Sequence, residues 1–130
     1  MSTQHSIYFA RLHAIQALYQ YQHSTDSIDD IGLQFKKRNS KVKFVTDWPY
    51  FDTLLHLYSR YDYYLRFILS VSTKRNLCII DTIIVKLCLI EVLHIRSNHL
   101  AVLKSYRIQL SNFSSVSTFQ TLVQVIEQLI

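Results

Sequence analysis

Apolar residues recur along the chain at the three- and four-residue spacing of an amphipathic helix, and short polar stretches separate these segments. The pattern predicts helices over residues 6–22, 28–37, 49–71, 77–95, 100–110 and 119–130. Residues 77–95 are apolar nearly all round, which is typical of a central helix enclosed by its neighbours. We therefore expect the core to be centred on that segment.

Polar residues at two of the expected helix starts support these boundaries. Ser27 is placed to cap the second helix, and Asp29 and Asp30 fall in its first turn, where the helix dipole favours negative charge. Asp47 is placed to cap the third helix, with Pro49 at a first helical position, where proline is well tolerated. Local chemistry and apolar spacing thus predict the same starts.

Glycine and proline are almost absent, because Gly32 and Pro49 are the only ones among the 130 residues. Chains with many β-turns use several such residues, so their scarcity favours helices. A single glycine also excludes the glycine-rich phosphate loops of nucleotide-binding enzymes. Hydrophobic residues make up 49% of the chain, which is enough apolar surface for one core. We expect an all-α protein with one domain over residues 1–130.

Basic residues outnumber acidic ones by 14 to 9, and the net charge of +5 favours a polyanionic partner, nucleic acid first. Residues 36–43 are strongly basic and contain no acid. Such a run is more often a solvated loop than a binding site. It could nevertheless share one face with basic residues elsewhere and contact phosphates. The candidate RNA-binding residues are Arg11, Lys36, Lys37, Arg38, Lys74 and Arg75.

Polar residues inside the apolar segment 77–95 bear on the compartment of the protein. An aspartate or lysine costs about 2.5–3.5 kcal/mol at the centre of a bilayer, so this segment is expected to be a core helix and not a membrane span. Cys78 and Cys88 are too far apart on one helix for a disulfide, and we expect buried thiols in a reducing, cytoplasmic setting. Glu91 needs a buried partner, which we expect to be an arginine, lysine or tyrosine.

Tyrosines and arginines alternate in the second half of the third predicted helix. Helical spacing favours packing for Tyr58 and Tyr61, whereas Tyr63 and Tyr64 point in different directions, so one of them should be exposed. Exposed tyrosines interleaved with arginines could stack on unpaired bases, at about 1–3 kcal/mol per base. The alternative is that these rings lie in the core or between subdomains.

Neither a catalytic pattern nor a metal-binding pattern is apparent. The six histidines show no His-Glu-x-x-His motif and no paired cysteine spacing. Glu91 and His94 could form half of a di-iron motif, but the site needs more glutamates than Glu91 and Glu127, the two in the chain. No local pattern supports an activated cysteine or serine nucleophile. We therefore expect no metal, no cofactor and no enzymatic activity.

Residues 10–11 (AR) and 14–22 (AIQALYQYQ) form a distinctive pattern in the first predicted helix. They resemble the opening helix of the NusB family of bacterial transcription antitermination factors, in which Ala-Arg and then Gln-Ala-Leu-Tyr-Gln-Trp-Gln recur in the same register. The central segment is similar to the family's central helix at Leu77, residues 80–81 (ID), Ile84, Leu87 and residues 90–93 (IEVL). Shorter similarities fall at residues 50–51, 62–69 and 125–129.

The resemblance implies the NusB fold, an all-helical domain of two small helical subdomains. It also implies binding of boxA-type leader RNA together with the ribosomal protein NusE on the RNA polymerase elongation complex. Tyr19 and Asp81 match family positions that lie against NusE, and an aromatic anchor beside a carboxylate suits a basic ribosomal protein. The alternatives are a core tyrosine and an ordinary first-turn acid. The resemblance also allows a homodimer.

The chain departs from the family where several arginines would fall, because residues 7–9 are Ile-Tyr-Phe and only Arg11 is left. The family's Asn-Glu-Ala signature is replaced near residues 104–106, and its Phe-Val-Asn-Gly is replaced near residues 121–124. We therefore expect a divergent, non-catalytic NusB-like factor. The alternative is a protein-interaction module of this fold that has lost RNA recognition.

Overall fold

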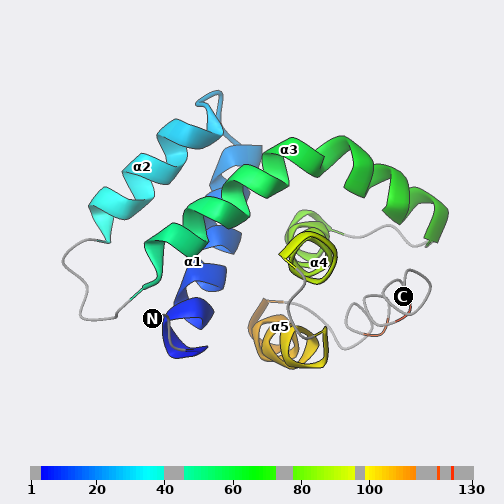
Figure 1. Cartoon of the computed structure of the whole chain (residues 1–130). Helices are drawn as coiled ribbons and strands as arrows, with labels where there is room; N and C mark the ends of the chain where they lie inside the picture. Colours follow the sequence, from blue (N-terminus) through cyan, green and yellow to red (C-terminus); the bar gives the residue numbers. More distant parts are fainter. Residues whose placement is uncertain are drawn as a thin grey trace. The chain divides into compact units, whose positions relative to one another are not determined.

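A computed structural model describes residues 4–39, 46–72, 78–95 and 99–113, together with residues 120 and 124. Its elements are all helical: α1 (Gln4–Gln22), α2 (Ile28–Arg38), α3 (Trp48–Ser72), α4 (Ile79–Ile90), a π-helical segment (Glu91–Ile95) and α5 (His99–Phe113) (Figure 1). No strand occurs among these residues. The all-α prediction is confirmed.

The helix boundaries agree with the expected ones to within a few residues, with one difference of kind. The apolar segment predicted as a single helix over residues 77–95 contains α4 followed by the π-helical segment. α5 also continues to Phe113, beyond the predicted end. The last predicted helix, residues 119–130, lies outside the described residues except for residues 120 and 124, both of which are helical.

Contacts within the chain divide it into two compact units, Met1–Ser59 and Arg60–Ile130, and α3 extends across the boundary. In the first unit α1 and α2 lie side by side, joined by the short connection at residues 23–27 (Figure 1). Gly32 lies where α2 packs closely against the first half of α3. A Cβ atom at that position would lie 3.1 Å from Leu55 Cδ1 and 3.9 Å from Phe51 Cε1.

An aromatic cluster forms the core of the first unit. The His13 ring on α1 stacks on the Trp48 ring, with centroids 5.3 Å apart and planes at 15°. Phe51 meets Trp48 edge-on at 5.1 Å and lies 6.1 Å from Phe35 of α2. Burial lowers the pKa of His13 below its ordinary value, against a smaller opposing effect of its hydrogen bond to Gln16. The imidazole therefore packs as a neutral ring near pH 7.

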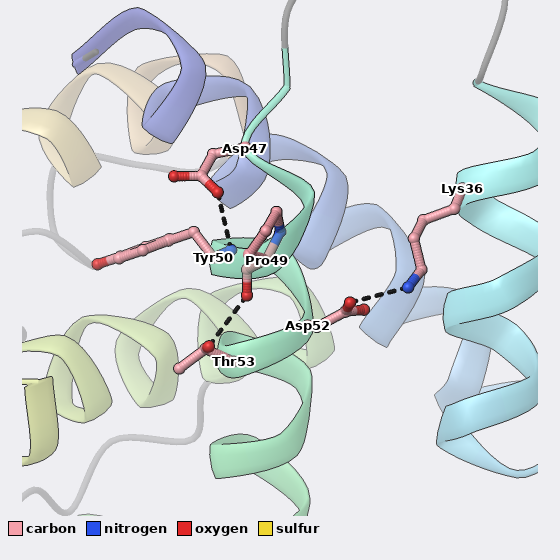
Figure 2. Close-up of polar contacts among 6 residues, drawn as sticks. All are labelled: Lys36, Asp47, Pro49, Tyr50, Asp52 and Thr53. Atoms are coloured by element: carbon pink, nitrogen blue, oxygen red, sulfur yellow. Dashed lines mark hydrogen bonds and ion pairs between the residues drawn. The ribbon is translucent and has the colours of Figure 1, made fainter. Parts of the chain in front are cut away.

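The starts of α2 and α3 form as the sequence predicts. The Ser27 Oγ accepts a hydrogen bond from the Asp30 N–H at 3.1 Å, which makes Ser27 the N-cap of α2. At α3 the Asp47 carboxylate accepts from the Tyr50 N–H at 3.0 Å, and the Thr53 hydroxyl donates to the Pro49 carbonyl (Figure 2). The Asp47 N–H donates to the Ser6 carbonyl at 3.2 Å, which ties this start to α1.

In the second unit α4 is buried nearly all round, and α5 and the π-helical segment pack against it. This confirms the enclosed central helix. Glu91 is fully buried and accepts a hydrogen bond of 2.5 Å from the Tyr106 hydroxyl, so the expected tyrosine partner is confirmed. Cys88 is buried as predicted, but the prediction for Cys78 is wrong: Cys78 is exposed because it precedes α4 as its N-cap residue.

Candidate interaction surfaces

The basic residues at the end of α2 lie on the surface but have partners within the chain. Lys36 Nζ lies 2.8 Å from Asp52 Oδ2 on α3 (Figure 2). The Arg38 guanidinium donates to the Gln20 side-chain oxygen at 2.7 Å and lies 5.1 Å from the centre of the Phe35 ring. Together with Lys37 these cations occupy the last turn of α2, where the helix dipole favours positive charge.

The other predicted RNA-binding residues do not join this group among the described residues. Arg11 is only 9% exposed, so its guanidinium presents little surface to a phosphate. Lys74 and Arg75 lie outside the described residues, as does the remainder of the basic run at residues 40–45. The burial of Arg11 has a sequence signal, because Ala14 and Leu18 follow it three and seven positions later on one helix face.

Tyr19 lies on the surface of α1, within the motif that carries the family resemblance. Ala14, Ile15, Ala17 and Leu18 are buried, whereas the Tyr19 side chain is 43% exposed. Its ring lies 4.6 Å from the His23 ring, one helical turn further on. This exposure excludes the alternative that Tyr19 is a core residue. Asp81, the second candidate for partner contact, lies in the first turn of α4 in the other unit and is buried.

The second half of α3 exposes more aromatic surface than the sequence predicts. Tyr63 and Tyr64 are both exposed, at 82% and 50%, where one was expected, and Phe67 is 59% exposed. Tyr58 is buried as predicted, and Tyr61 stacks on His94 with ring centroids 3.9 Å apart. The signal for these exposed rings is helical spacing, because the buried Leu65, Ile68 and Leu69 lie on one face of the helix and leave the opposite face to solvent.

A charged cluster beside that face was not anticipated. Lys86 of α4 is almost fully buried, and its Nζ lies 2.8 Å from Asp62 Oδ1 on α3. The other oxygen of Asp62 lies 3.1 Å from Arg66 Nε, one turn along α3. A lysine in an apolar helix signals the need for a buried partner, but the spacing of 24 residues leaves that partner's identity to the packing.

Metal-binding clusters are not found in the part of the chain that the structure describes. No group of three or more His, Cys, Asp or Glu side chains there could hold a metal ion. Burial and the nearby Arg60 charge lower the pKa of His94. The described helices also include none that is both long enough and apolar enough to cross a membrane.

No model of a known protein family matches the chain, and no curated protein matches it significantly.

Proposed function

We propose that the protein is a non-catalytic transcription antitermination factor of the NusB type, which binds boxA-type leader RNA together with the ribosomal protein NusE on the RNA polymerase elongation complex. The fold class supports this proposal, because all elements of the described residues are helical, as the proposal requires. The motif at residues 14–22 lies entirely within α1.

The observation that carries the proposal is the exposure of Tyr19 in the middle of that motif. A tyrosine held by a rigid helix and open to solvent can anchor a protein partner, because it buries a large ring at little entropic cost. The resemblance assigns this position to the NusE contact. Asp81 is a weaker support, since it is buried in the first turn of α4.

A second candidate function is favoured by the basic residues. Arg11 is buried and Lys36 pairs with Asp52, so two of the predicted phosphate contacts are already occupied or covered. A protein-interaction module that binds NusE without boxA RNA fits these two observations. Both functions use Tyr19 to contact NusE, but only the first includes binding of boxA RNA.

Replacing Tyr19 with alanine is expected to raise the Kd for purified NusE about tenfold or more, because the anchor ring is lost. Isothermal titration calorimetry measures this Kd. Leu33→Ala is the matched control, since Leu33 is an exposed apolar residue on α2 of the same unit. It should bind NusE like the unmodified protein. If Tyr19→Ala binds as tightly as the control, or if the unmodified protein binds no NusE, the proposed partner is wrong.

A further inference from the structure

One face of α3 in the second unit carries exposed aromatic rings that the packing of the unit does not use. Tyr63, Tyr64 and Phe67 are all at least half exposed. Phe67 is four positions after Tyr63 and three after Tyr64, so it neighbours both rings on the helix surface. We call these residues the aromatic stripe. Its position on a single regular helix fixes the spacing of the rings before any ligand binds.

The charges around the aromatic stripe are predominantly positive. Arg60 and Arg66 lie on the same segment, and the Arg66 side chain is 64% exposed. Asp62 is the one acid in residues 60–71, and its carboxylate contacts both Arg66 and the buried Lys86. Two exposed cations, Arg60 and Arg66, therefore accompany a single carboxylate at this surface, that of Asp62, which is shared with the buried Lys86. Such a surface attracts polyanions and repels other basic surfaces.

We propose that the aromatic stripe is a stacking platform for the unpaired bases of single-stranded RNA, with Arg60 placed to contact its phosphates. Aromatic side chains interleaved with cations bind single strands in this way, because every base has a face that can stack. The choice of RNA as the nucleic acid rests on the proposed function. The stripe supplies the RNA contacts that the buried Arg11 does not offer.

A second copy of the chain is the competing occupant, and the charges disfavour it. Two facing stripes would bring together the arginines of both copies within a protein whose net charge is +5. The stripe also lies on one helix, whereas a stable interface buries about 800 Å² on each partner. For RNA, by contrast, the same surface offers positive charge for the phosphates and aromatic rings for the bases.

The test uses the full chain and a fluorescently labelled oligouridylate of about twelve nucleotides, without NusE. Fluorescence anisotropy gives the Kd. Each of Tyr63→Ala, Tyr64→Ala and Phe67→Ala is expected to weaken binding roughly 5- to 100-fold, the loss of one stacked base. Tyr64→Phe, which keeps the ring, should bind like the unmodified protein. Arg60→Gln should lower the slope of log Kd against log salt concentration by about 0.7, the value for one phosphate contact with a single strand.

Leu100→Ala is the control, because Leu100 is an exposed apolar residue on α5 of the same unit. The inference is overturned if the three alanine variants bind oligouridylate like this control, or if the unmodified protein does not bind it. Dimerisation that the alanine variants abolish, in the absence of RNA binding, would assign the stripe to a second copy instead. NusE binding is measured separately, so a failure of the proposed function is distinguishable from a failure of the stripe.

Discussion

Replacing Phe51 with alanine should lower the free energy of unfolding by about 3–5 kcal/mol, the usual loss for a buried aromatic ring. Phe51 is fully buried and holds the aromatic cluster together, edge-on to Trp48 and 6.1 Å from Phe35. A Cβ atom added at Gly32 of α2 would also come within 3.9 Å of the Phe51 ring. Removal leaves a cavity between α2 and α3 that the surrounding side chains fill only in part.

Phe67→Ala is the matched control, because it makes the same chemical change on the same helix at a residue that is mostly exposed. Its cost should stay within about 1 kcal/mol, as is usual for a surface position. Urea denaturation followed by far-ultraviolet circular dichroism measures both changes. Equal losses for the two variants would mean that Phe51 is not a core residue.

Replacing Asp62 with alanine should cost about 2–4 kcal/mol, because it leaves the buried Lys86 ammonium without its carboxylate. Lys86 Nζ lies 2.8 Å from Asp62 Oδ1, and the Lys86 side chain is almost fully buried. The expected loss is below that of a fully buried pair, since the Asp62 side chain keeps some contact with solvent. Adding Lys86→Met to Asp62→Ala should recover most of the stability, because the buried ammonium is then removed together with its carboxylate.

Asp52→Ala is the control, because it removes an ion pair of the same length that is not buried. Asp52 also lies on α3, and its carboxylate is likewise 2.8 Å from a lysine, Lys36, but both partners of that pair are substantially exposed. Its loss should be below about 1 kcal/mol, the range of surface ion pairs. The same denaturation experiment compares the two aspartates. A loss for Asp62→Ala no larger than that for Asp52→Ala would contradict the role of burial.

The fold class was predictable because its signals are local. Ser27 and Asp47 cap their helices through backbone groups three residues away, and apolar spacing is a property of one segment at a time. Glu91 required a partner, and tyrosine was among those expected, because a buried carboxylate is costly without one. The position of Cys78 was missed, since helix ends are less well defined by pattern than helix centres.

The candidate surfaces were harder to predict because they depend on which face of a helix is covered. Arg11 carries a charge that suggests a phosphate contact, yet it shares a helix face with buried residues. Only one of Tyr63 and Tyr64 was expected to be exposed, because they point in different directions, whereas both are exposed. The pair of Asp62 and Lys86 joins two helices, so no single segment contains its signal.

Simultaneous binding of NusE and boxA-type RNA is the core of the proposed function, and the coupling between these two ligands is its sharpest test. The Kd for labelled boxA RNA should be measured with and without saturating NusE. We expect NusE to lower this Kd at least about fivefold, since coupled sites typically influence one another by that much or more. An RNA Kd that is the same in the presence and absence of NusE would overturn the proposal that the two ligands are bound jointly.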